Sequence, residues 1–243
     1  MKLTIPVIAV LAISLTSAGQ SAPNKNEWGE KFNSNGATLT FKEIGRGQAN
    51  GQTIITYNLY ASGLPKNVSY GLWNKIVGSE PRALTDAYIN NDGKIVNVLA
   101  DPARNIAEDP INIKAVAGMG EPKLFAVISD DGMHRAFAQV IPFPIERKSG
   151  PCQISVVMLA KDYAYVQIRV TGLQPGEELQ TDANSEEEAG HGAGLATDQG
   201  IYEALVGPEV RGKVSGKARF TVTAKSCTVG IEFPWGQGSY HLQ

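Results

Sequence analysis

Short apolar runs separated by turn-forming residues dominate the chain. Clusters of glycine, proline, asparagine and aspartate recur roughly every 8–15 residues, and the runs between them alternate or are rich in β-branched residues. The predicted strands are 38–43, 53–61, 69–75, 87–89, 95–99, 124–128 and 136–140, then 153–159, 164–171, 177–181, 201–206, 216–223 and 228–233. Asp92-Gly93 and Asp131-Gly132 predict tight turns. A turn of helix is expected only at 102–108, because no segment shows a sustained helical period.

A break in this pattern divides the chain. Proline and glycine are concentrated between Pro142 and Pro151, where they stop strand pairing without forming a long linker. We therefore predict a signal peptide at 1–22, a first β-sandwich domain at 23–147 and a second at 151–243. A connection this short favours a restricted mutual orientation of the two domains.

The two halves resemble each other in sequence. Residues 57–73 (YNLYASGLPKNVSYGLW) and 166–181 (VQIRVTGLQPGEELQT) both read as a strand, a Gly-Leu pair with proline just after it, and a second strand. Each half then has a glycine before an apolar run, at Gly93 and Gly200. Because the order of these features is shared, we infer an ancient duplication.

The chain begins with a pattern typical of export. Met1-Lys2 precede an apolar run from Leu3 to Leu15, and small residues follow as far as Ala22, as in a cleaved secretory signal peptide. Polar residues interrupt the run too early for a membrane-spanning helix. We expect a secreted or periplasmic protein with no membrane span in the mature chain.

Cys152 and Cys227 are the only cysteines. Two cysteines in an exported chain pair by default, and a nucleophilic cysteine would need an activating histidine, which neither has beside it. We predict a structural disulfide that ties the first strand of the second domain to its last.

About six or seven short strands in each half, with turns at this spacing, are typical of small Greek-key sandwiches. The segment Gly172–Leu179, the paired cysteines and the final Phe233-Pro234-Trp235-Gly236 resemble immunoglobulin-like or fibronectin-like modules of bacterial secreted proteins. The first half is similar but has no cysteine. The resemblance implies an all-β fold of two tandem sandwiches and a binding, spacing or scaffolding role. It brings no catalytic residues with it.

Charge and motif content exclude several classes of function. Lysine and arginine number 22 against 24 acidic residues, for a net charge of −2, and neither half has the basic patch that nucleic acid requires. His134, His191 and His241 are the only histidines, and none has metal-ligand spacing. The glycine-rich segment 45–51 predicts a hairpin loop. We assign no catalytic residue and no cofactor, and expect a protein or polysaccharide partner.

Two groups of residues are candidate ligand sites. Among small polar residues, the acidic run near His191 predicts a solvated, mobile loop; the alternative is a weak calcium site formed by Asp182, Glu186, Glu187 and His191. Exposed Trp28, Trp73 and Trp235 would suit stacking on sugars. Alternatively, Trp73 is the central core tryptophan of a sandwich, and Trp235 packs on the final turn or the domain junction.

The leading interpretation is a non-catalytic exported interaction or scaffold protein. A carbohydrate-binding module is the alternative. A third interpretation is a small secreted hydrolase that uses the carboxylates of Asp101, Glu108 and Asp109.

Overall fold

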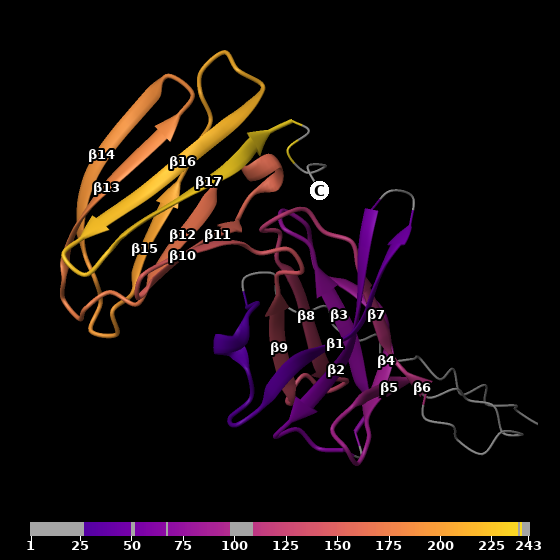
Figure 1. Cartoon of the computed structure of the whole chain (residues 1–243). Coiled ribbons are helices and arrows are strands. Elements are labelled where there is room, and N and C mark those ends of the chain that lie inside the picture. Colours follow the sequence, from indigo (N-terminus) through magenta and orange to yellow (C-terminus); the bar gives the residue numbers. More distant parts are fainter. Residues whose placement is uncertain (1–26, 50–51, 67, 98–108, 238, 240–243) are drawn as a thin grey trace, which may run out of the picture.

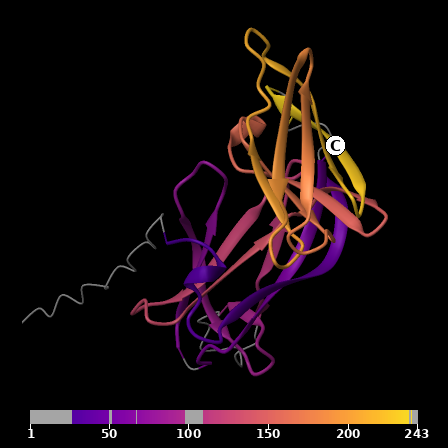
Figure 2. The ribbon, with the colours of Figure 1, turned by 90° about the vertical axis from the view of Figure 1, so that its left-hand side faces the viewer.

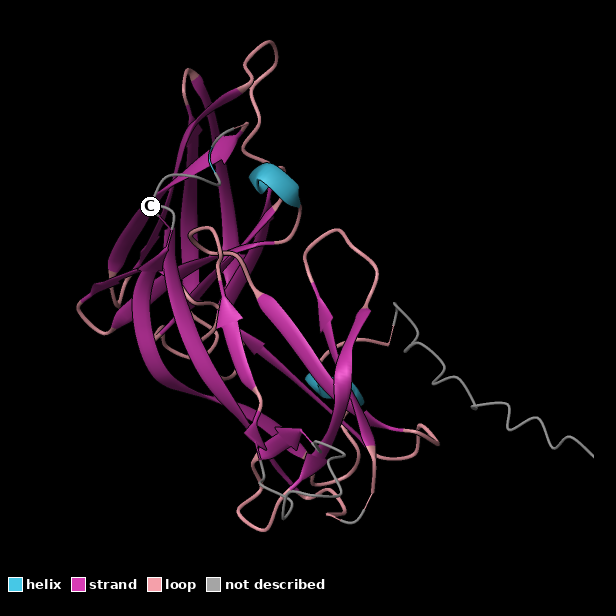
Figure 3. Cartoon of the chain, turned by 90° about the vertical axis from the view of Figure 1, so that its right-hand side faces the viewer, coloured by secondary structure: helices cyan, strands magenta, loops and turns pink. Residues whose placement is uncertain are grey.

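The computed structural model describes residues 27–49, 52–66, 68–97, 109–237 and 239. The predicted signal peptide, the predicted helical turn, Asp101, Glu108 and His241 lie outside the described residues. Strands make up most of the described chain, together with the short 3-10 helices η1 (Glu30–Phe32) and η2 (Lys161–Tyr163) (Figure 3). Within the described ranges, no helix is long and apolar enough to cross a membrane.

The strands form two β-sandwiches that occupy separate lobes of the molecule (Figures 1 and 2). The first sandwich has a sheet of order β1-β2-β7 and a sheet of order β6-β5-β4-β3-β8-β9. These strands are β1 (Thr38–Ala49), β2 (Gln52–Ser62), β3 (Tyr70–Lys75), β4 (Arg82–Ile89), β5 (Ile95–Asn97), β6 (Asp109–Pro110), β7 (Asn112–Ala115), β8 (Lys123–Ser129) and β9 (Arg135–Val140).

The second sandwich pairs a sheet of order β10-β11-β12-β15 with a sheet of order β14-β13-β16-β17. Its strands are β10 (Ile145–Ser149), β11 (Cys152–Met158), β12 (Val166–Thr171), β13 (Glu178–Ser185), β14 (Glu188–Leu195), β15 (Tyr202–Val206), β16 (Ser215–Ala224) and β17 (Thr228–Gly236). The prediction of an all-β chain with two tandem sandwiches is therefore confirmed. Strand β10, which spans the predicted boundary at residue 147, pairs with β11 of the second sandwich.

The two sandwiches share one topology. The order β1-β2-β7 corresponds to β11-β12-β15, and the order β4-β3-β8-β9 corresponds to β14-β13-β16-β17. The inferred repeat fits this correspondence. Gly63 after β2 and Gly172 after β12 both have a positive φ, 70° and 84°. A β-carbon on either would lie about 2 Å from a main-chain oxygen, that of Gly36 or of Pro151, so both turns require glycine.

Alternation explains why each sandwich has its own core. In β11 the residues Cys152, Ile154, Val156 and Met158 are buried while those between them are partly exposed, as expected of a strand with one face in the core. The sandwiches have separate apolar clusters, one around Ile168 and one around Leu59 in β2. A third, smaller cluster lies outside both.

That third cluster corrects the sequence-based position of Trp73. Trp73 is buried on the outer face of the β3-β8-β9 sheet with Phe137 of β9, beneath Trp28 and Phe32 of the N-terminal segment. Trp28 contacts Phe137 edge-on, with the ring centroids 5.3 Å apart. The core of the first sandwich instead contains Tyr70 and Leu72 from the same strand. Leu72 is the neighbour of Trp73, and neighbouring residues of a strand point to opposite faces.

The predicted disulfide is present. Cys152 at the start of β11 and Cys227 in the turn between β16 and β17 are bonded, with their Cα atoms 6.3 Å apart. The expectation that the bond joins the first and last strands is only partly right, because β10 precedes β11 in the same sheet. The bond connects the two sheets of the second sandwich at one end.

Two segments predicted as loops are strands. β1 continues to Ala49 through Gly45 and Gly47, which pair with Thr56 and Ile54 of β2. The acidic run near His191 belongs to a hairpin in which Ser185 pairs with Glu188 across a two-residue turn. Pairing with a long neighbouring strand overrides the weak strand propensity of these glycine-rich sequences.

Candidate functional site

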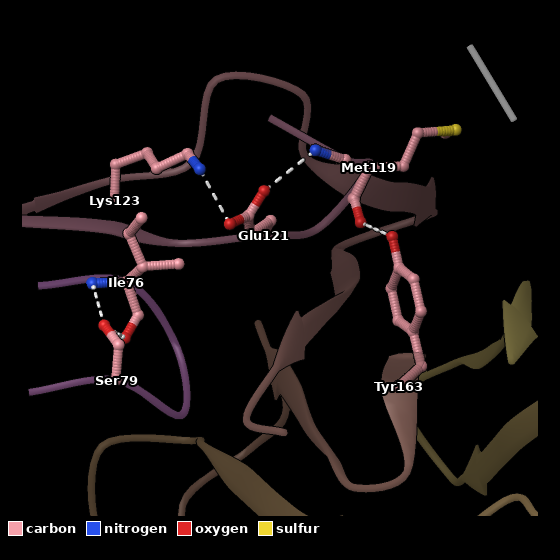
Figure 4. A network of polar contacts seen from close by, with 7 residues as sticks. Ile76, Ser79, Met119, Glu121, Lys123 and Tyr163 are labelled. Atoms are coloured by element: carbon pink, nitrogen blue, oxygen red, sulfur yellow. Dashed lines mark hydrogen bonds and ion pairs between the residues drawn. The ribbon is translucent and has the colours of Figure 1, made fainter. Parts of the chain in front are cut away.

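The contacts between the two sandwiches include a network of polar groups. Val77, in the turn after β3, and Met119, in the segment before β8, both pack against the apolar core of the second sandwich. The turn at Val77 is held by Ser79, whose hydroxyl donates to the carbonyl of Ile76 at 2.8 Å (Figure 4). We call residues 76–79, 117–123 and 141–144, with the groups of the second sandwich that contact them, the junction.

Gly120 connects the junction through its main chain. Its N–H donates to the carbonyl of Phe143 at 2.6 Å, and its carbonyl accepts from the N–H of Met158 in β11 at 2.9 Å. Its φ is +69°, and a β-carbon there would lie 3.0 Å from the carbonyl oxygen of Val156 and 3.1 Å from Cδ1 of Ile145. Only glycine fits this close approach to the second sandwich without strain.

Tyr163 extends into the junction from η2 of the second sandwich. It is fully buried, and its hydroxyl donates to the carbonyl of Met119 (Figure 4). Asp162 and Tyr163 both have a positive φ, a conformation that costs a non-glycine residue about 1 kcal/mol or more. Burial, with a smaller contribution from the nearby charge of Glu121, raises the pKa of Tyr163 to about 12.

Glu121 is the buried charge of the junction. Its side chain is 1% exposed, and one carboxylate oxygen accepts from Nζ of Lys123 at 2.7 Å. The other oxygen accepts from the N–H of Gly118 at 2.9 Å. A buried carboxylate is tolerated when it is paired and hydrogen-bonded in this way. The pair fixes the fold of the 118–121 segment that presents Met119 and Gly120 to the second sandwich.

These contacts can hold two domains in one orientation. A connection with few contacts would leave the domains free to move, whereas this junction combines apolar packing with main-chain and side-chain hydrogen bonds. The roles of Gly120, Glu121 and Tyr163 were not predicted from the sequence. The sequence around Gly118 and Gly120 reads as an ordinary loop, and nothing local indicates which distant strand it contacts.

The candidate tryptophans lie in three different settings. Trp73 and Trp235 are 6% and 1% exposed, so neither presents a ring face on which a sugar could stack. Trp235 lies within the core of the second sandwich. Trp28 is partly exposed, and Lys75 lies over its ring with Nζ 6.0 Å from the centroid.

The candidate calcium ligands are divided between separate interactions. Nδ1 of His191 lies 2.5 Å from Oδ1 of Asp182 across the β13–β14 hairpin. Glu186 instead accepts from the N–H of Lys217 and the amine of Lys213, and these contacts hold the pKa of its carboxyl below the usual range. Glu187 is exposed at the turn. Among the described residues, no three histidine, cysteine or acidic side chains come close enough to hold a metal ion.

The fold and the junction define a protein of two β-sandwich modules in tandem. The second module contains a disulfide, and hydrogen bonds and apolar contacts connect the two. No known protein family and no curated protein matches the chain. The solved structures with low similarity include the following three. One is a tetra-tandem repeat in the extending region of a large adhesion protein, with 9% identity and a TM-score of 0.27, over 84% of this chain and 50% of that one.

The second is a DUF3823 family protein from Bacteroides ovatus, with 11% identity and a TM-score of 0.23, over 82% of this chain and 97% of that one. The third is Salmonella alpha-2-macroglobulin reacted with methylamine, with 10% identity and a TM-score of 0.26, over 84% and 17%. The chain thus spans about half the length of the first structure. At these TM-scores the likenesses support no argument about function.

Proposed function

We propose that the chain is a non-catalytic, exported interaction protein that works as a scaffold, with its two sandwiches held in a fixed orientation. The observation that carries the proposal is the double hydrogen bonding of Gly120, between Phe143 of the connection and Met158 of the second sandwich. A protein that only tethers two independent binding modules does not require these hydrogen bonds at the junction. A scaffold that holds a partner in one direction does require them.

The disulfide supports the exported part of the proposal. Cys152 and Cys227 are bonded, and structural disulfides persist in oxidising compartments such as the periplasm or the cell exterior. The partner in this proposal is a protein or a polysaccharide at one of those locations. Export can be tested separately by mass spectrometry of the mature N-terminus, for which we expect cleavage after residue 18 or 22.

The fixed orientation can be tested by distance measurement between the sandwiches. Spin labels on unnatural amino acids at Leu84 and Leu205, which are 42% and 67% exposed, would report one distance for each molecule without using cysteines. We expect a narrow distance distribution in the unaltered protein. The Gly120→Ala variant should broaden it, because the added β-carbon meets Val156 and Ile145.

Gly47→Ala is the matched control. Gly47 lies in β1 with nothing within 4 Å of an added β-carbon, so its distribution should remain narrow. A broad distribution in the unaltered protein would overturn the scaffold proposal and favour independent modules. An equally narrow one in Gly120→Ala would show that Gly120 does not set the orientation.

A further inference from the structure

The free edge of strand β14 distinguishes the second sandwich from the first. β14 is the outermost strand of its sheet. Its counterpart in the first sandwich, β4, is covered on the corresponding edge by β5 and β6. Proteins usually protect such edges with lysine, proline or a bulge. β14 has none of these over eight residues, and its register with β13 is unbroken.

The inner face of β14 carries three glycines after Glu188. Gly190, Gly192 and Gly194 pair with Ala183, Thr181 and Leu179 of β13, and the latter two are buried. At Gly192 an added β-carbon would meet Thr181, and at Gly194 it would meet the ring of Tyr202 at 2.5 Å. At Gly190 it would meet nothing within 4 Å. The space above Gly190 is therefore open.

This space is a slot of about 240 Å³ between β14 and the end of β15. Its lining includes the apolar side chains of Ala183, Val206, Pro208, Phe220 and Phe233. Ser185 also lines it, and its hydroxyl donates to the carbonyl of Pro208 at 2.5 Å. The apolar part of this lining can receive an aliphatic side chain of an added strand.

The charges beside the slot are acidic and available. Glu188 and Glu209 line it and are exposed, and Glu187 lies at the adjoining turn. None of these three carboxylates forms an ion pair with another described residue. Arg219 also lines the slot. It is one basic group beside three carboxylates, so the local charge remains acidic. Lysine or arginine in a ligand would complement it.

We propose that β14 and this slot bind an extended peptide segment of another protein, which adds to the free edge of β14 as a new strand. The peptide inserts one aliphatic side chain above Gly190 and places a lysine or arginine near Glu188 and Glu209. Strand addition of this kind combines main-chain pairing with a pocket for an alternate side chain. The inference rests on the proposed function, because it gives the interaction protein a class of partner.

A second copy of the chain fits the edge less well. If two β14 strands paired antiparallel, the glycines of one copy would share the inner face with those of the other. The slot would then receive either no side chain or the carboxylate of Glu188 from the other copy, which its apolar lining and acidic rim disfavour. A peptide of different sequence can supply the missing side chain.

Selection from a displayed library of random nine-residue peptides tests the proposal on the whole mature protein. We expect enriched sequences to share an aliphatic residue with lysine or arginine within about two positions. They should bind at least about tenfold more weakly to Gly190→Val, because the added side chain fills the slot. Gly47→Val is the matched control, since Gly47 is a strand glycine with equal free space, and it should bind normally.

Charge reversal and amide exchange complete the test. Glu188→Lys should weaken binding of the basic peptides, and the bound peptide should slow hydrogen exchange of alternate amides along β14. Failure to enrich any peptide, or equal binding to Gly190→Val, would overturn the proposal. A dimer in solution that Gly190→Val leaves intact and that blocks β14 would favour a second copy instead. The scaffold proposal is separately decided by the spin-label distances.

Discussion

The hydroxyl of Tyr163 in the second sandwich donates a hydrogen bond to the main-chain carbonyl of Met119 in the first. Only the neutral phenol can donate it. Folding therefore favours the protonated form, in agreement with a pKa raised from an ordinary 10 to about 12. The resulting stabilisation is fully present below pH 10 and is lost as the pH rises from 10 through 12.

The Tyr163→Phe variant should separate this effect from other alkaline effects. At pH 8 we expect it to lower the free energy of unfolding by about 1–2 kcal/mol, because the Met119 carbonyl loses its donor. Between pH 10 and 12 the unaltered protein should lose on the order of 2 kcal/mol more than the variant. Burial also raises the pKa values of Tyr57 and Tyr70, but both proteins share those residues. A stability gap that stays constant with pH would contradict the prediction.

Reduction of the disulfide should weaken one sandwich only. The bond between Cys152 and Cys227 spans 75 residues, all within the second sandwich. Closing a loop of this length stabilises by about 4–5 kcal/mol in the chain-entropy account. We expect the double variant Cys152→Ala, Cys227→Ala to speed hydrogen exchange in β11–β17 and to leave β1–β9 nearly unchanged. Equal loss of protection in both sandwiches would show that they unfold as one unit.

The sequence was most informative where local chemistry decides the structure. Asp-Gly turns and alternating runs such as β11 were predictable, because each depends on neighbouring residues. The disulfide was predictable because two cysteines allow only one pairing. β14 was missed for the opposite reason. Its sequence around Gly192 lacks β-branched residues. It forms a strand because its main chain pairs with the edge of β13.

Contacts between distant residues could not be predicted from the pattern. Trp73 was expected in the sandwich core. It lies instead on the face of β3 opposite to that of its neighbour Leu72, under Trp28. Nothing near Glu121 indicates that its carboxylate is buried beside a second domain. Such positions depend on how whole sheets stack, and the hydrophobic pattern specifies only that a residue is buried.

The shared turn geometry predicts equivalent defects in the two sandwiches. Gly63→Ala and Gly172→Ala each place a β-carbon about 2 Å from a main-chain oxygen at a positive φ. Each should cost about 2 kcal/mol or more, the first in the first sandwich and the second in the second. Gly47→Ala should change stability by less than about 1 kcal/mol, since nothing lies near its β-carbon. Denaturation followed by hydrogen exchange would assign each loss to its sandwich, and a neutral Gly63→Ala would argue against equivalent turns.

The N-terminal segment should stabilise the first sandwich from outside its core. Trp28 packs on Phe137, and Asn33 accepts a hydrogen bond from the N–H of Phe137 at 2.7 Å. Ser34 exchanges hydrogen bonds with Arg135 through its N–H and its hydroxyl, so this segment also covers the outer edge of β9. Removing Trp28 would uncover the buried Trp73.

We therefore expect Trp28→Ala to lower the stability of the first sandwich by about 2 kcal/mol, less than for a fully buried tryptophan because the ring is partly exposed. Asn33→Ala should cost about 1 kcal/mol by leaving the Phe137 N–H without its acceptor. Lys31→Ala is the control, because Lys31 is exposed and lies over the ring of Phe32 with Nζ 5.0 Å from the centroid. In Trp28→Ala only Trp73 and the buried Trp235 emit, so a spectrum typical of an exposed tryptophan would report that Trp73 is in contact with water. A spectrum typical of buried tryptophans, together with unchanged stability, would mean that the sheet face is protected without this segment.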